Sequence, residues 1–323
     1  MKFQAVLESL RYPIWQAPTA SLAGPELAAA VSKAGGMGSM ALTWTPPDIA
    51  AELVRQVREA TANPFFVNFA LAFPPVSLDA ALEVGVLIVT FSWGDPEPHL
   101  PKVKAAGAFV GIQVTNIPGV KRAIDQGADF LICQGVEAGG HVQSSTPLLQ
   151  LLPRVIEAAG KVPVIAAGGM SSGADIAKVL ALGAKGAILG TRFLATQESR
   201  AHPEYKRQLV EAQGATALTV CFDGAWPYSA HRVLRNSTLE TWEAHGCPKV
   251  GNRPGEGETI AQTADGEAIF RYEDTAPKQG YVGDIEAMCL YSGTGVAAIT
   301  DIPPAGELVE RLWQECSAAL APG

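Results

Sequence analysis

Short apolar runs alternate with segments of helical spacing over the first two-thirds of the chain. The apolar runs predict strands at 13–17, 37–42, 65–69, 86–90, 109–114, 130–134, 162–167 and 186–190. The segments between them predict helices at 25–34, 48–60, 120–126, 148–159 and 175–182. In the last of these, Ile176, Val179 and Leu180 share one helical face, and Gly183 is suited to end the helix in a left-handed turn.

Strands that alternate with helices pair in parallel through right-handed crossovers. Eight is the strand number of the (β/α)8 TIM barrel, an α/β fold whose smallest members have about 200 residues. A doubly wound open sheet is the alternative. The barrel is favoured because no Gly-x-Gly-x-x-Gly motif follows the first predicted strand.

The alternation stops after Gly190. A helix is predicted at 202–212, whereas 218–283 is rich in glycine, proline and charge and lacks the apolar periodicity of an independent core. Helical patterns return at 284–292 and 305–319. These features predict a barrel over 1–215, an inserted, lid-like α+β subdomain over 216–283, and C-terminal helices over 284–323 that return to the barrel.

The charge and cysteine content narrow the function classes. The formal net charge is −8 and no block of Lys and Arg occurs, so neither nucleic acid nor an anionic membrane is an expected partner. The five cysteines form no CxxC pair and the histidines no zinc-binding pair, so no metal site is expected. No apolar run reaches the roughly 18 residues of a membrane span. We expect a cytoplasmic protein that acts on a small molecule.

Two predicted strand ends carry glycine where a barrel binds phosphate. The seventh strand ends in Gly168-Gly169 and the eighth in Gly190-Thr191. In TIM barrels these loops commonly hold a phosphate, which accepts hydrogen bonds from backbone amides. The next residue, Arg192, either neutralises charge there or, as strand-end arginines more often do, forms a salt bridge with the outer helices.

The loop after the sixth strand combines glycines, which carry no side chain, with a histidine. Its sequence is Gln134-Gly-Val-Glu-Ala-Gly-Gly-His141. Glycine lets a ligand approach the chain closely, and a histidine can exchange a proton near neutral pH. We therefore expect His141 to be the catalytic group beside the phosphate loops. Glu137 either orients the imidazole or caps backbone amides, and the second role is favoured.

The segments 13–18, 25–36, 64–68, 134–141, 163–169, 186–194 and 292–301 carry the motifs of a known family. On these residues the chain resembles the nitronate monooxygenases, formerly called 2-nitropropane dioxygenases. The resemblance implies a (β/α)8 barrel with a smaller inserted domain and non-covalently bound FMN. It extends to FMN-dependent enoyl-acyl-carrier-protein reductases and NAD(P)H:quinone reductases, which share the Glu-Ala-Gly-Gly-His loop.

The resemblance also implies that His141 is the catalytic histidine and that the strand ends bind FMN. The first strand would line the flavin, the amides of the third, fifth and sixth would hydrogen-bond its ring or ribityl chain, and the glycine loops would hold the ribityl and phosphate groups. In chain order these residues are Ala17, Pro18, Thr19, Asn68, Gln113, Gln134, Gly140, Ala167, Gly168, Gly169, Gly190 and Thr191. The sequence departs from the family at Gln113, where some members have lysine, and at Val142-Gln143, where Arg-Gly or a glycine is common.

Two enzymatic hypotheses follow from the resemblance. In the first, which is favoured, an alkyl nitronate is oxidised with O2 as co-substrate to a carbonyl compound and nitrite. His141 removes the α-proton of a neutral nitroalkane as general base. In the second, NAD(P)H reduces the FMN, which then reduces a quinone or an enoyl thioester, and His141 is a proton donor or pocket residue.

A third hypothesis belongs to a different class. The chain could be a flavin- or phosphate-binding barrel without turnover, or a non-redox lyase, because a fold does not by itself define a function.

Overall fold

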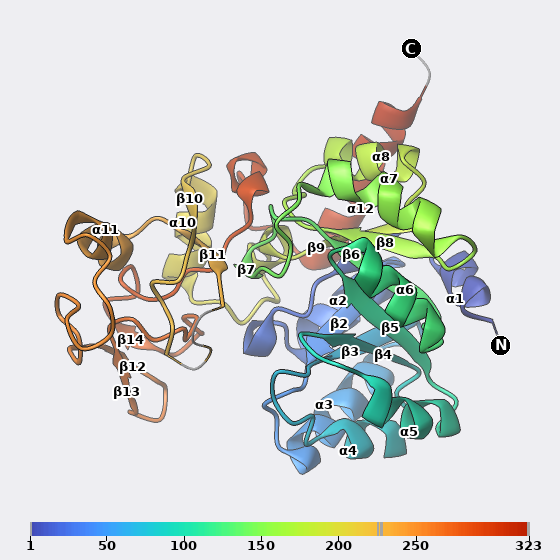
Figure 1. Cartoon of the computed structure of the whole chain (residues 1–323), viewed down its shortest axis with the longest axis horizontal. Helices are drawn as coiled ribbons and strands as arrows, with labels where there is room; N and C mark the ends of the chain where they lie inside the picture. The colour runs from blue at the N-terminus through green and yellow to red at the C-terminus, as the bar shows by residue number, and fades with distance from the viewer. Residues whose placement is uncertain (1, 225, 227–228, 322–323) are drawn as a thin grey trace.

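The computed structural model describes residues 2–224, 226 and 229–321. The remaining positions, 1, 225, 227, 228, 322 and 323, fall in the three predicted domains but lie outside the described residues. Two lobes are visible in Figure 1, a larger one that holds both ends of the chain and a smaller one formed mainly by residues after 200.

Eight parallel strands of the described residues form the nearly closed barrel of the larger lobe. Their order around the barrel is β1 (Ile14–Gln16), β9 (Gly186–Leu189), β8 (Val164–Ala167), β6 (Phe130–Gln134), β5 (Phe109–Val114), β4 (Ile88–Ser92), β3 (Phe65–Ala70) and β2 (Gly38–Ala41). A parallel bridge between Trp15 and Met37 brings β1 against β2. Each strand overlaps its predicted run, and the predicted TIM-barrel fold is confirmed.

Helices cover the outside of the barrel. Those predicted from spacing are present as α2 (Pro25–Ala34), α3 (Pro47–Ala60), α6 (Ile117–Asp125), α7 (Leu148–Ala159), α8 (Gly173–Ala181), α10 (Pro203–Glu211) and α12 (Ala305–Leu320). Gly183 follows α8 with a φ of 103°, as expected for a left-handed stop. Several short helical segments were not predicted because they show too few turns of periodicity: α1 (Phe3–Ser9), α4 (Leu78–Glu83), α5 (Leu100–Ala105), α9 (Thr191–Leu194), η1 (Ala20–Leu22), η2 (Glu97–His99) and η3 (Thr294–Ala298).

The barrel has an inner and an outer apolar layer. Outside, the strands pack on the helices, and α12 lies against both α2 and α8. Inside, one end of the barrel is filled by aromatic and branched side chains that include Trp15, Phe66 and Phe130. Phe3 of α1 stacks on Phe130 with ring centroids 4.3 Å apart. This packing closes the amino-terminal end, which leaves the opposite end for a ligand.

The smaller lobe contains a three-stranded sheet that includes part of the predicted catalytic loop. Strand β10 (Thr216–Thr219) pairs with β11 (His231–Leu234), which pairs with β7 (Gly140–His141). The rest of the lobe consists of α11 (Ser237–Ala244), β12 (Thr259–Gln262), β13 (Ala268–Phe270) and β14 (Val282–Gly283). The sequence of 218–283 lacks the apolar periodicity of an independent core, and in the structure its buried side chains pack together with residues 285–289. Its short strands and loops bury two apolar clusters, around Phe222 and around Ile260.

The predicted helix at 284–292 is also wrong, because this segment runs through turns and extended backbone. Asn236 Nδ2 donates to the carbonyls of Glu286 (2.8 Å) and Met288 (2.7 Å), and Thr238 Oγ1 donates to that of Ala287 (2.7 Å). These carbonyls are the acceptors that a helix would use. The residues of this segment join the apolar clusters of the smaller lobe rather than returning at once to the barrel. The domain boundaries themselves remain a prediction.

No helix among the described residues combines the length and the apolar content needed to cross a membrane. Within the same part of the chain, His, Cys, Asp and Glu form no cluster that could hold a metal ion.

Candidate active site

A cavity of about 260 Å³ lies at the carboxyl ends of the barrel strands, where residues of the smaller lobe reach the barrel. Active sites of TIM barrels lie at this end. All of the sequence-predicted site residues line the cavity: Ala17, Pro18, Thr19, Asn68, Gln113, Gln134, Gly140, His141, Ala167, Gly168, Gly169, Gly190 and Thr191. The fold therefore brings together residues that are far apart in the sequence.

The ends of β8 and β9 place bare backbone along one wall. Gly168 and Gly169 follow β8 with φ angles of 117° and 70°, in the left-handed region that favours glycine. A Cβ on Gly169 would lie 2.6 Å from Cβ of Glu137 and 2.8 Å from Oγ1 of Thr294. This wall leaves no room for a side chain at Gly169, so a ligand there would meet the backbone.

Segment 292–295 completes the same wall, and the sequence analysis did not assign it to the site. Gly293 and Gly295 line the cavity, and the Gly293 amide donates to Oγ1 of Thr191 (2.9 Å). The neighbouring Ser171 Oγ is buried and has no hydrogen-bond partner among the described residues. The resemblance of residues 292–301 to the family could have indicated that this segment belongs to the site, but no single residue of it was assigned a role.

The wall on the side of β1 and β3 presents two polar groups. Oγ1 of Thr19 is buried in the cavity without a partner among the described residues. Asn68 Nδ2 donates to Oγ1 of Thr90 on the adjacent strand (3.0 Å), which fixes the orientation of its amide. This side of the cavity therefore has an oriented amide and, beside it, a buried hydroxyl without a partner among the described residues.

Two further amides come from β5 and β6. Gln113 Nε2 donates to Oε1 of Gln143 (2.7 Å), and Gln134 Oε1 accepts from the backbone N–H of Gln143 (3.1 Å). Gln143 lies two residues after His141, in the part of the loop that departs from the family pattern. The sequence analysis named this departure but gave no contact for it.

His141 stands on the short strand β7, which pairs with β11 of the smaller lobe. Its Nε2 is buried and has no hydrogen-bond partner among the described residues. Burial, and secondly the nearby His231, lower the pKa of His141 to about 3. The imidazole is therefore neutral near pH 7 and can accept a proton from a bound molecule.

His231 lies opposite His141 in the β7–β11 pair, and its protonation state is fixed by backbone groups. Its Nε2 accepts from the Phe222 amide (3.2 Å), so its Nδ1 carries the hydrogen that is donated to the Ser229 carbonyl (3.0 Å). Burial lowers the pKa of His231 as well. The neighbour of His141 is thus a second neutral ring rather than a charge.

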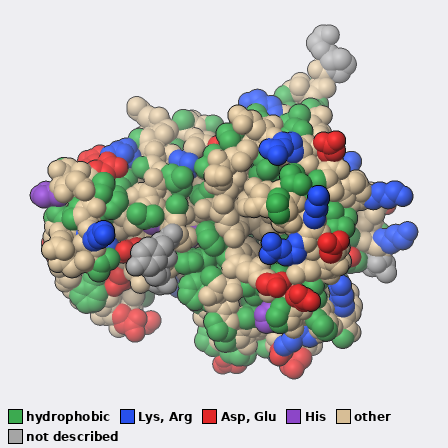
Figure 2. Space-filling model, in the orientation of Figure 1, with side chains coloured by type: hydrophobic (Ala, Val, Ile, Leu, Met, Phe, Trp, Pro, Cys, Tyr) green, Lys and Arg blue, Asp and Glu red, His purple; other side chains and the backbone are tan. Residues whose placement is uncertain are grey.

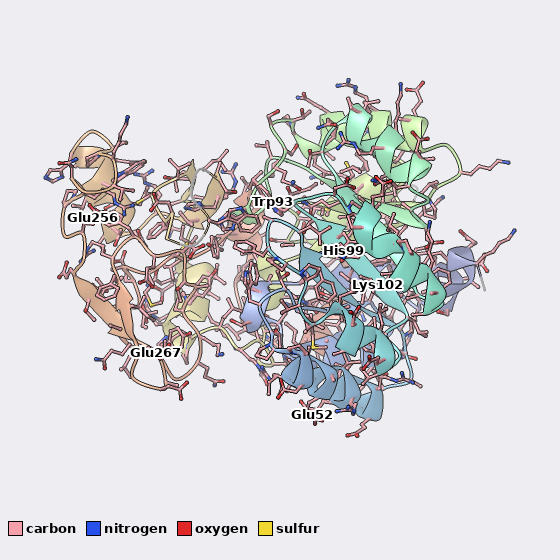
Figure 3. All side chains as sticks on the ribbon, turned by 60° about the horizontal axis from the view of Figure 1, so that its bottom comes forward. Glu52, Trp93, His99, Lys102, Glu256 and Glu267 are labelled. Carbon is pink, nitrogen blue, oxygen red and sulfur yellow. The ribbon has the colours of Figure 1, made fainter. Side chains whose placement is uncertain are left out.

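Aromatic rings surround the exposed side of His141. Trp226 has its ring centroid 4.3 Å from that of His141, Tyr291 lies at 5.6 Å and Trp93 at 6.1 Å. Trp93, which follows β4, lies where the two lobes meet (Figure 3). The sequence did not point to either Trp226 or Tyr291 as a site residue, because Trp226 lies in a stretch without regular spacing and Tyr291 falls in the wrongly predicted helix at 284–292.

None of the described residues that line the cavity is Lys, Arg, Asp or Glu. On the outer face in Figure 2, acidic and basic side chains are interspersed over the molecule.

Glu137 does not face His141. Its carboxylate accepts from the Leu148 amide at the start of α7 (2.9 Å), which confirms the favoured capping role. Arg192 does not line the cavity and forms a salt bridge, as expected, but its partner Asp301 (2.6 Å) lies in the segment before α12 rather than on an outer helix.

Comparisons with known proteins agree with this geometry. The family model described as nitronate monooxygenase matches residues 3–80 and 75–315. The chain belongs to the nitronate monooxygenase family. It is 30% identical to a nitronate monooxygenase from Pseudomonas aeruginosa, over 96% of this chain and 97% of that protein.

Other proteins that are similar to this chain carry other names. A Rhodococcus jostii protein named (3aS,4S,5R,7aS)-5-hydroxy-7a-methyl-1-oxo-octahydro-1H-indene-4-carboxyl-CoA dehydrogenase is 34% identical, over 95% of this chain and 93% of the relative. A solved structure of a nitroalkane oxidase from Streptomyces ansochromogenes has a TM-score of 0.76 and 31% identity, with 98% of each chain covered. The chain is therefore an oxidoreductase of a family whose members are flavin enzymes in general and act on small molecules.

Proposed function

We propose that the chain is an FMN-dependent nitronate monooxygenase that converts alkyl nitronates, and neutral nitroalkanes, with O2 to carbonyl compounds and nitrite. The observation that carries the proposal is the state of His141. His141 lines the cavity in which the predicted flavin-binding residues meet, its imidazole is neutral, and its buried Nε2 has no hydrogen-bond partner among the described residues. In this neutral state the imidazole can accept a proton and carries no additional proton to donate.

The cavity fits a phosphorylated planar cofactor. The glycines after β8 and the segment 292–295 form a wall of backbone, and the hydroxyls of Thr19 and Ser171 lack partners among the described residues. Backbone amides and hydroxyls are common ligands of phosphate. The glycines after β8 and the segment 292–295 would hold the phosphate end of FMN, and the amides of Asn68 and Gln113 would bind its ring. Bound FMN would supply the electron-transfer chemistry, and the protein the placement.

The protein's own contribution to the reaction is a proton transfer. His141 Nε2 takes the α-proton of a nitroalkane, and the electron pair of the broken C–H bond moves to the nitro group to give the nitronate. The imidazolium that forms is stabilised by the negative charge of the nitronate beside it, which offsets the low pKa of the free group. A substrate that arrives as the nitronate skips this step.

The test is direct. Purified protein is denatured and the released cofactor identified, and the native protein is then supplied with an alkyl nitronate in air. We expect FMN in the supernatant and nitrite with the matching carbonyl compound as products. Protein that is colourless and releases no flavin, or that binds FMN without producing nitrite, contradicts the proposal. The first outcome would instead point to a lyase, and the second to a reductase or binding protein.

The second candidate is an NAD(P)H-dependent reductase of a quinone or enoyl thioester. Two observations favour it: the uncharged cavity lined by Trp93 and Trp226, which suits a neutral planar group, and a 34% identical relative named as a dehydrogenase of a coenzyme A thioester. Anaerobic mixing with NADH and NADPH separates the candidates. Rapid bleaching of the flavin supports the reductase, whereas bleaching by nitronate alone supports the monooxygenase.

A further inference from the structure

Gln143 makes two contacts that the proposed function does not use. Its Oε1 accepts from Gln113 Nε2 (2.7 Å), and its backbone N–H donates to Gln134 Oε1 (3.1 Å). Gln113 and Gln134 line the cavity from neighbouring strands, β5 and β6, whereas the Gln143 side chain is exposed. One residue outside the strands thus holds two amides of the cavity wall.

The contact with Gln134 determines which end of its amide is available to a ligand. A backbone N–H can only donate, so the Gln134 group that faces it must be the oxygen. The NH2 group lies on the other branch of the same planar amide and is turned away from Gln143. Since Gln134 is 8% exposed and lines the cavity, its NH2 is the polar end that a bound molecule can reach.

The hydrogen bond from Gln113 Nε2 to Gln143 restrains the Gln113 side chain. One hydrogen of Gln113 Nε2 is committed to Gln143, which leaves the second hydrogen and Oε1 for a ligand. Without its acceptor, this side chain would lose entropy each time it bound a ligand, because a long polar side chain has several rotamers. Among the described residues that line the cavity there is no Lys or Arg that could replace Gln113 as a hydrogen-bond donor.

We propose that Gln143 is a positioning residue that sets the reduction potential of bound FMN through Gln113 and Gln134. The inference rests on the proposed function, because FMN must occupy the cavity. Reduction adds electron density to the flavin ring, so oriented N–H donors beside it stabilise the reduced form more than the oxidised form.

The experiment measures the midpoint potential of bound FMN in Gln143→Met. This change removes the side-chain acceptor but keeps the length of the side chain and the backbone N–H. We expect reduced FMN to bind about tenfold more weakly relative to oxidised FMN, which lowers the potential by about 30 mV for a two-electron couple. Gln150→Met, an equal change at an exposed position of α7, should leave the potential unchanged.

A double-mutant cycle separates positioning from a general effect. If Gln143 acts through Gln113, then Gln143→Met should add little to the shift already caused by Gln113→Met. Thermal unfolding of all variants measures any loss of stability. A merely structural role of Gln143 would lower the unfolding temperature and leave the midpoint potential of bound FMN unchanged. Full additivity, or an unchanged potential in Gln143→Met, overturns the inference. Wild-type protein without FMN overturns the proposed function and this inference with it, whereas bound FMN of unchanged potential overturns this inference alone.

Discussion

His141 and His231 lie directly opposite each other on the paired strands β7 and β11, with imidazole centroids 5.4 Å apart. The first belongs to a loop of the barrel and the second to the smaller lobe. Both rings are neutral near pH 7, because burial lowers both pKa values. The candidate base is thus held by a strand pair between the lobes rather than by a carboxylate partner.

Replacement of His141 by Asn should separate the two steps of the proposed reaction. Turnover of a neutral nitroalkane should fall by about 10²- to 10⁴-fold, the usual contribution of a general base. Turnover of the preformed nitronate should change little, since that substrate has already lost its proton. Nitrite release is measured with both substrates, and FMN content serves as the control. Equal activity of variant and wild type on the nitroalkane would remove His141 from this role.

The same histidine should make stability depend on pH. In the unfolded chain its pKa is about 6.5, whereas in the folded chain it is about 3. Between these values the unfolded state binds a proton that the folded state does not, so the free energy of unfolding falls as the pH is lowered. Denaturant midpoints at pH 7.5 and pH 5 should differ more for wild type than for His141→Asn. A pH dependence that is identical in both proteins contradicts the assigned neutral state.

The ion pairs of Asp301 should contribute more to the free energy of unfolding than the exposed ion pairs do. It accepts from Arg192 (2.6 Å), whose side chain is only 3% exposed, and from Arg311 (2.6 Å). Asp301→Asn removes the carboxylate that pairs directly with the buried Arg192. Because Asp301 itself is 41% exposed, we expect a loss of about 1–3 kcal/mol, below that of a fully buried pair.

The control for this change is Asp79→Asn, which breaks the exposed ion pair with Lys102. It should cost less than about 1 kcal/mol. Chemical denaturation of both variants measures the difference, and equal losses would contradict the buried role of Arg192.

Gly169 and Gly107 offer a matched pair for the backbone wall. Their φ angles are 70° and 73°, so alanine suffers a similar conformational cost of about 1–2 kcal/mol at either position. A Cβ on Gly107 meets no atom within 4 Å, whereas one on Gly169 comes within 2.6 Å of Glu137. Gly169→Ala should therefore also weaken FMN binding, while Gly107→Ala should not. Fluorescence titration with FMN tests this, and similar affinities would exclude the wall from the cofactor site.

The barrel could be predicted because its strands are buried on both faces and appear as apolar runs. In β4 and β6 every residue is buried. The segment 284–292 was misread because its apolar spacing fits a helix, while its carbonyls are bound by Asn236 and Thr238 from a distant segment. No local pattern carries that information.

Only part of the site could be predicted from the sequence. Residues at strand ends could be placed, since parallel strands bring their carboxyl ends to one face. Trp226 and Tyr291 could not, because their positions beside His141 depend on how the smaller lobe packs on the barrel. Gln143 could be recognised as unusual, but its hydrogen bond to Gln113 spans 30 positions and follows from the fold.

The pairing of β7 with β11 has a consequence for how this enzyme can change. The glycine wall belongs to the barrel and the tail of the chain, whereas Trp226, His231 and Tyr291 around the imidazole belong to the smaller lobe. Exchange of the lobe with that of a relative would therefore alter the surroundings of His141 and leave the glycine wall in place. Diversity of substrates within such a family can accumulate on one side of the cavity while the other side stays the same.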